Sequence, residues 1–161
     1  MGFAAQSAEM LLRMAMSALD GPLEQLIPTL DALPAAIVVT DRRGAITHFN
    51  RAFLDFVGTV PDLGRPGWYK GWNLYTVEGQ PIPEERTPTA IALREQRSVR
   101  GVESIAERPD GLRIRFRSHP TPIFDPSGEM LGAINLLVET EPRQWMHEDD
   151  AAPAARYAAR R

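Results

Sequence analysis

The chain has 161 residues, 43% of them hydrophobic and 24% charged, with a formal net charge of −3, which is typical of one globular domain with short extensions. That charge gives no general attraction to nucleic acid or anionic membranes, and the absence of cysteine excludes disulfides, thiolate metal sites and cysteine nucleophiles. No apolar run approaches the ~20 residues of a membrane helix, and the first residues lack the basic start of a secretory signal, so we expect a cytoplasmic protein.

Residues 1–29 are predicted to form an N-terminal helical extension. Residues 4–19 are rich in Ala, Leu and Met, which are strong helix formers. A second short helix is expected over residues 22–33, with Pro28 bending or interrupting it. One stripe of the first helix is apolar, through Met10, Leu11, Met14 and Ala18. Two interpretations are open: the helix caps its own domain, or it pairs with a second copy or a partner.

The next segment predicts two strands and a capped helix. "AAIVVT" and "AITHFN" are strand-like runs that flank a turn at residues 41–44. Asn50 precedes "RAFLDFVG", where its side chain can accept a backbone N–H and begin a helix. Residues 58–88 are dense in Gly, Pro and aromatic residues, and short helical turns are expected there. Thr87 and Pro88 then begin a longer helix.

Two hairpins complete the predicted sheet. In the first, a three-residue loop with Gly111 in the left-handed conformation sets Glu107 opposite Arg113 and Glu103 opposite Arg117. One face of this hairpin is then apolar, and the other carries charged residues with Ile105 among them. A last strand, "EMLGAINLLVET", follows the turn at residues 125–128. From residue 142 the apolar period is lost, and residues 142–161 are predicted to be a flexible tail.

Few residues are suited to catalysis or to metal binding. His48, His119 and His147 are not spaced as metal ligands. The common nucleotide-binding and serine-hydrolase motifs are absent from the sequence. We therefore expect no metal site and no enzyme; a histidine base at His48 or His119 is the remote alternative.

Residues 30–140 resemble a PAS domain, and in particular the PAS modules that precede HWE-type sensor histidine kinases in bacteria. The matching segments are "LDALPAAIVVTDRRGAITHFNRAF", "LYTVEGQPIP", "ALREQRSVRGVESIAERPDGLRIRF" and "HPTPIFDPSGEMLGAINLLVET". The resemblance implies an α+β fold over residues 30–141, in which helices flank a five-stranded antiparallel sheet and enclose a pocket. It also implies a sensory domain that binds a small molecule or another signalling protein.

The chain departs from that family in informative ways. "ETEPRQ" stands where PAS kinases have an Asp-Ile-Thr segment leading into a signalling helix. Residues 86–97 lack the histidine that haem-binding PAS sensors usually supply, and a flavin–cysteinyl adduct needs a cysteine. No cofactor is therefore expected, although a noncovalent one remains open.

The first hypothesis is a stand-alone PAS protein that modulates bacterial two-component signalling by dimerising or by binding a histidine kinase or another PAS protein. A fragment of a larger kinase is the other interpretation of the chain. The expected interface combines the stripe of the first helix with Ile105 and Arg115 on the charged sheet face. The alternative hypothesis is a sensor for a small apolar metabolite, with a pocket lined by Ile37, Val39, Phe53, Ile91, Phe116 and Ile134.

Overall fold

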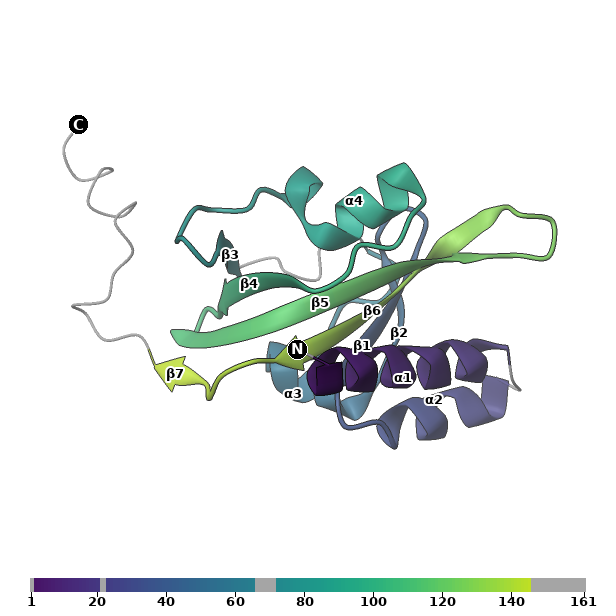
Figure 1. Ribbon diagram of the computed structural model, residues 1–161, viewed down its shortest axis with the longest axis horizontal. Coiled ribbons are helices and arrows are strands. Elements are labelled where there is room, and N and C mark those ends of the chain that lie inside the picture. The colour runs from purple at the N-terminus through teal and green to yellow at the C-terminus, as the bar shows by residue number, and fades with distance from the viewer. Residues whose placement is uncertain (1, 21–22, 66–71, 146–161) are drawn as a thin grey trace.

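The computed structural model of the chain describes residues 2–20, 23–65 and 72–145. Its helices are α1 (Gly2–Leu19), α2 (Leu23–Asp31), α3 (Arg51–Val57) and α4 (Pro88–Glu95), with a 3-10 turn η1 at Glu84–Arg86. Its strands are β1 (Ala36–Asp41), β2 (Ile46–Phe49), β3 (Asn73–Thr76), β4 (Val102–Glu107), β5 (Leu112–Phe124), β6 (Met130–Glu139) and β7 (Gln144–Trp145). Figure 1 shows α1 and α2 on one side of the sheet and α4 on the other.

The predicted α+β fold with an antiparallel sheet is confirmed, but the described residues form seven strands rather than five. The sheet order is β2-β1-β6-β5-β4-β3, and β7 pairs with β5. The additional strands, β3 and β7, lie in segments predicted to be irregular or disordered. β7 has 2 residues, too few for a strand pattern, and β3, with 4 residues, lies in the segment rich in Gly and Pro, which favours turns. Residues 146–161 of the predicted tail lie outside the described residues.

The central strands are buried on both faces. Ile37 and Ile134 belong to a core cluster that includes residues of α1 and α2. Val38 and Leu137 belong to a second cluster on the opposite face, with Phe53 and other aromatic residues. We call the face with α1 and α2 the outer face, and the face with α3 and α4 the inner face. Two hydrophobic layers therefore enclose β1 and β6.

The predicted helix start signals are confirmed. Asn50 accepts a hydrogen bond from the Phe53 backbone N–H through Oδ1 at 3.0 Å, and caps α3. Thr87 caps α4 by accepting from the Ala90 N–H at 3.3 Å, with Pro88 in the first turn. Pro28 lies inside α2 and does not end it, so the expected interruption of this helix is absent. Local capping thus fixes where both inner helices begin.

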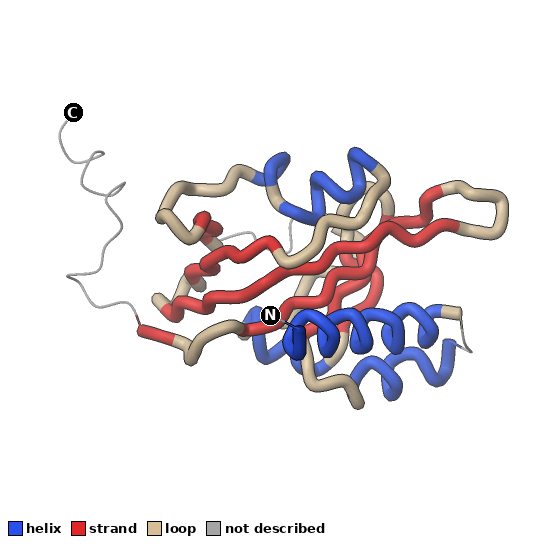
Figure 2. The backbone as a smooth tube through the Cα atoms, in the orientation of Figure 1, coloured by secondary structure: helices blue, strands red, loops and turns tan. Residues whose placement is uncertain are grey.

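The predicted register of the β4–β5 hairpin is also confirmed. Glu107 pairs with Arg113 and Glu103 with Arg117, and Gly111 has the left-handed φ of 85° that the three-residue loop requires. The β5–β6 hairpin is longer, and its tip projects beyond the helices (Figure 2). This register places every second residue of β4 and β5 on the inner face, opposite α4.

Candidate functional site

A small cavity lies between α4, the segment before it and the inner face of the sheet. Its free space is about 20 Å³, which is room for about one water molecule. Half of its lining is apolar and half is polar but uncharged: Leu74, Ile82, Thr87, Pro88, Thr89, Ser104, Phe116, Ser118, Asn135 and Leu137. The cavity therefore differs from the apolar pocket that the sequence predicts.

Asn135 connects the cavity wall to α4. It lies on β6 and is 3% exposed. Its Nδ2 donates to Thr89 Oγ1 on α4 at 3.0 Å, and its Oδ1 accepts from the His119 backbone N–H at 3.0 Å. Because a buried amide is costly unless its polar atoms are paired, these bonds hold α4 at a defined place over the sheet.

Two serines lie beside it on neighbouring strands. Ser118 donates to the Val102 carbonyl at 3.5 Å, the upper limit of a hydrogen bond. Ser104 is 2% exposed, and its Oγ has no hydrogen-bond partner among the described residues. A buried hydroxyl without a partner costs about 1–3 kcal/mol. Ser104 Oγ is therefore a polar atom of this cavity that lacks a hydrogen-bond partner among the described residues.

The structure separates the six residues predicted to line a pocket. Ile37, Val39 and Ile134 pack on the outer face under α1 and α2, away from the cavity. Phe53 and Phe116 lie on the inner face, and Phe116 alone of the six lines the cavity.

Ile91, the remaining member, lines a separate surface groove beside α4. The grouping of these six around one pocket is therefore corrected. Because β1 and β6 are apolar on both faces, their alternation could not indicate which residues face inward.

The sequence pattern does not by itself assign the polar lining residues to a site. A signal existed for two residues: Ser104 occupies an inward position of a strand whose neighbours there are apolar, and Asn135 interrupts the apolar run "GAINLLV". An uncharged polar residue in such a place needs a buried partner. The contributions of Thr87 and Thr89 depend on where α4 packs, which the local sequence does not determine.

The outer face of β4 and β5 carries a ladder of ion pairs. Arg113 pairs with Glu107 at 3.0 Å, and Arg115 pairs with Glu103 at 2.7 Å. Arg117 is a weaker partner of Glu103 at 3.6 Å. The cross-strand contacts expected from the sequence are therefore present, but Glu103 makes its shorter contact diagonally.

Ile105 and Arg115, both predicted as interface residues, lie directly opposite each other within this ladder. Tyr75 of β3 pairs with Ile105 on the other side. Burial, followed by the Glu107 carboxylate, raises the pKa of Tyr75 from its ordinary value of 10, which widens the pH range over which its phenol is neutral. The centre of this surface is thus less polar than its margins.

The predicted stripe on α1 is divided between the interior and the surface. Met10 and Met14 are 64% and 50% exposed, whereas Leu11 packs against the outer-face cluster. The side chain of Ala18 lies outside the described residues. The helix packs on its own sheet through Ala8, Leu12 and Ala15, as the capping interpretation expects, and the two methionines remain on the surface.

Solved structures of PAS domains match this fold. One from Colwellia psychrerythraea is 26% identical, with a TM-score of 0.55, and the match covers 73% of this chain and 96% of that one. A PAS domain of an HTR-like protein from Haloarcula marismortui is 22% identical, with a TM-score of 0.50 and coverages of 84% and 99%. The PAS domain of BvgS from Bordetella pertussis is 18% identical, with a TM-score of 0.51 and coverages of 85% and 94%.

A profile of the PAS domain family matches residues 23–97. The chain contains a PAS domain. The predicted resemblance is thereby confirmed at the level of the family, and PAS domains are sensory and signalling modules. No curated protein matches the chain. None of the helices in the described ranges is long and apolar enough to cross a membrane.

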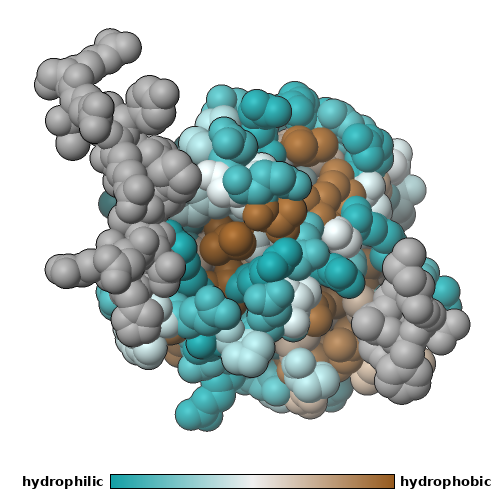
Figure 3. All heavy atoms as spheres, turned by 60° about the vertical axis from the view of Figure 1, so that its left-hand side comes forward, coloured by the Kyte–Doolittle hydropathy of each residue, from teal (hydrophilic) through white to brown (hydrophobic). Residues whose placement is uncertain are grey.

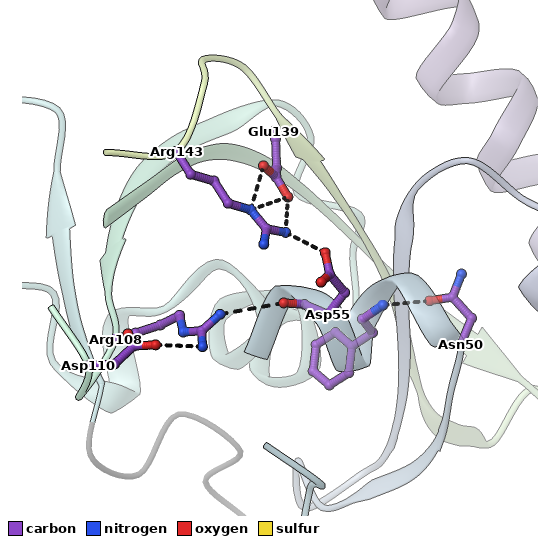
Figure 4. A network of polar contacts seen from close by, with 7 residues as sticks. Asn50, Asp55, Arg108, Asp110, Glu139 and Arg143 are labelled. Carbon is purple, nitrogen blue, oxygen red and sulfur yellow. Dashed lines mark hydrogen bonds and ion pairs between the residues drawn. The ribbon is translucent and has the colours of Figure 1, made fainter. Parts of the chain in front are cut away.

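A polar network joins α3 to the β4–β5 loop and to the segment after β6 (Figure 4). Arg143, which follows β6, contacts Glu139 at 2.7 Å and Asp55 of α3 at 2.8 Å. The hydrogen bond with Glu139, the largest contribution, raises the pKa of Arg143. Nearby, Arg108 of the β4–β5 loop pairs with Asp110 at 2.7 Å and donates to the Asp55 carbonyl at 3.5 Å. The C-terminal end of α3 is thus held from two directions.

Proposed function

We propose that this PAS domain modulates bacterial two-component signalling by binding a histidine kinase, another PAS protein or a second copy of itself. The observation that supports it best is the part of the outer face formed by β4 and β5, which lies outside the cluster that α1 and α2 cover in the described part of the chain. There Ile105, half-buried, lies between Tyr75 and Arg115. Helices α1 and α2 pack elsewhere on the same face, against residues of β1 and β6.

The composition of this surface suits a protein partner. An interface typically has a less polar centre and a charged margin, with Tyr and Arg enriched. Here Tyr75 and Ile105 form the centre, and the Arg–Glu ladder surrounds them. Hydrophobic residues also form a band across the mostly polar face of the molecule that Figure 3 shows.

Capture of partners from cells tests this proposal. We expect the wild-type chain to retain a histidine kinase or another PAS protein, identified by mass spectrometry, and Arg115→Glu to lose it. Arg42→Glu is the matched control, because Arg42 forms a comparable surface ion pair with Glu129 at 3.1 Å outside the ladder. Equal capture by Arg115→Glu, or capture of no signalling protein by the wild type, would contradict the proposal.

The dimer proposal concerns α1 and needs a different variant. Deleting residues 1–20 would uncover the outer-face cluster and confuse folding with association. Met10→Glu with Met14→Glu instead changes only surface positions, spaced by one helical turn. We expect the mass in light scattering to fall from dimer to monomer while the helical circular dichroism is kept. A mass that does not change would count against a dimer built on this stripe.

A second candidate function is the sensing of a small ligand, and the unpaired Ser104 hydroxyl favours it. A ligand that satisfies this group removes a buried polar penalty, and its binding stabilises the folded state by mass action. Native mass spectrometry of the purified chain, followed by thermal-shift screening with small metabolites, tests this function. We expect at least one compound to raise the melting temperature.

A further inference from the structure

A surface groove of about 570 Å³ lies beside α4, outside the cavity. Its apolar lining includes Ile91 of α4, Val102 at the start of β4, and the side chains of Ile82 and Pro88. Glu78 and Arg86 lie among its polar lining residues with opposite charges, so the lining favours neither a cation nor an anion. A groove of this size accommodates the apolar body of a small molecule.

The groove and the cavity share a wall. Ile82 and Pro88 line both of them. Pro88 is fixed in the first turn of α4, and the backbone of Ile82 is held by its N–H bond to the Leu74 carbonyl at 2.7 Å. The Ile82 side chain is half-buried, so of these two residues it is the one whose side chain can change rotamer.

The chemistry on each side of this wall differs. The groove has an apolar part of aliphatic and proline side chains beside Thr76, Glu78, Gln80 and Arg86. The cavity instead presents the uncharged polar groups of Ser104, Ser118 and Asn135. No charged residue lines the cavity within the part of the chain described, and burying an unpaired charge is strongly unfavourable. The free space of about 20 Å³ admits one hydroxyl or carbonyl group, but no larger part of a ligand.

We propose that the groove and the cavity form one site for a neutral, amphipathic small molecule. Its apolar body lies against Ile91 and Val102, and its single polar group passes Ile82 to hydrogen-bond with Ser104 Oγ. This inference rests on the ligand-sensing function proposed above and specifies the ligand class. It replaces the wholly apolar metabolite predicted from the sequence, because an apolar ligand leaves the Ser104 hydroxyl unpaired.

A pair of probes that differ by one polar group tests the proposal. Benzyl alcohol and toluene are each titrated into the full chain, and binding is followed through backbone amide shifts in two-dimensional NMR. Benzyl alcohol is expected to shift the amides of Ile82, Ile91, Val102 and Ser104 saturably, and to bind about fivefold more tightly than toluene, the ratio expected for one hydrogen bond. Equal affinities, or shifts confined to residues elsewhere, would overturn the proposal.

Two variants that each remove one buried hydroxyl group separate a ligand contact from a structural effect. Ser104→Ala removes the unpaired hydroxyl of the cavity and should abolish the preference for benzyl alcohol without loss of stability. Thr121→Val is the matched control, because Thr121 Oγ1 is also a buried hydroxyl without a partner among the described residues, and Thr121 pairs with Ile134 on the outer face. If the Ser104→Ala variant still prefers benzyl alcohol to toluene, the hydrogen bond between the ligand and Ser104 Oγ is wrong. The partner of Ser104 would then be a buried water molecule.

Closing the wall provides a test that does not depend on the serine. Ile82→Trp should obstruct the passage between the groove and the cavity. It should weaken the binding of benzyl alcohol at least as much as Ser104→Ala does. If Ile82→Trp leaves the benzyl alcohol affinity unchanged, the route past Ile82 is wrong. Ligand sensing itself has a separate readout, because a metabolite can raise the melting temperature even when the two probes bind equally.

Discussion

Arg143 Nη2 lies 2.8 Å from Asp55 Oδ2, so the segment that follows β6 is joined to α3 across 88 residues of sequence. The same guanidinium makes hydrogen bonds to both carboxylate oxygens of Glu139. The two residues after Arg143 form β7, which pairs with β5 at Leu112 and Arg113. The Arg143 contacts and the pairing of β7 with β5 thus both hold the segment that follows β6.

We expect Arg143→Ala to change the local order of β7 more than the global stability. Asp55 is 74% exposed, and exposed ion pairs contribute less than about 1 kcal/mol. Amide hydrogen exchange at Gln144 and Trp145 should accelerate, because β7 has only 2 residues of its own. Asp55→Asn, which keeps the Glu139 contact, should produce a smaller change. Unchanged exchange in Arg143→Ala would show that the ion pairs do not hold this strand.

Asn50 is expected to be among the most sensitive positions of the domain. It is 1% exposed, and its side chain accepts from the N–H groups of Ile37 and Phe53 and donates to the carbonyls of Leu30 and Ala35. Asn50→Ala should cost about 3 to 5 kcal/mol, because these buried groups lose their partner.

Urea denaturation of Asn50→Ala measures this effect, with Asn73→Ala as the control. Asn73 is exposed and donates one hydrogen bond to Glu107 at 3.3 Å. Asn73→Ala should therefore change the free energy of unfolding by no more than about 0.5 kcal/mol. Similar costs for the two variants would contradict the role of Asn50 as the common partner of α2, β1 and α3.

His119 should make the stability of the domain depend on pH below neutrality. Burial, followed by the charges of Arg100 and Arg117, lowers its pKa from the ordinary value of 6.5. Protonation therefore favours the unfolded chain, and stability is lost as the pH falls through 6.5 toward the folded-state pKa.

Urea midpoints between pH 7 and pH 5 test this dependence. His119→Gln should flatten the curve over this range, and Arg100→Gln should flatten it in part by removing one of the two neighbouring charges. A curve for His119→Gln that coincides with the wild type would assign the pH dependence to other groups.

Gly132 is expected to resist any side chain. A Cβ at this position would overlap the backbone carbonyl of Thr40 on the neighbouring strand, and neither strand can move because both are packed on two faces. Gly132→Ala should cost about 3 kcal/mol. Gly111→Ala is the comparison: its φ of +85° is strained for alanine, but nothing lies within 4 Å, so the cost should be about 1 kcal/mol. A smaller effect at Gly132 than at Gly111 in thermal denaturation would contradict close packing of β1 and β6.

The sequence alone predicted those features whose causes lie within a few residues. Asn50 and Thr87 cap helices by bonding to N–H groups three residues later. Glu107 and Arg113 meet because a three-residue loop fixes the hairpin register. The sequence also predicted which face of β4 and β5 is polar, because charged and apolar residues alternate along those strands.

Only the tertiary structure decided the inner and outer sides of β1 and β6, since helices cover both faces and apolar residues occupy both. The same packing divided the predicted pocket between two layers and placed Ser104, Asn135 and Thr89 around one small cavity. Alternation of apolar and polar residues identifies the buried face of a strand when its other face is exposed to water. When both faces are buried, the segments that pack on each face, which are distant in sequence, determine which residues face the cavity.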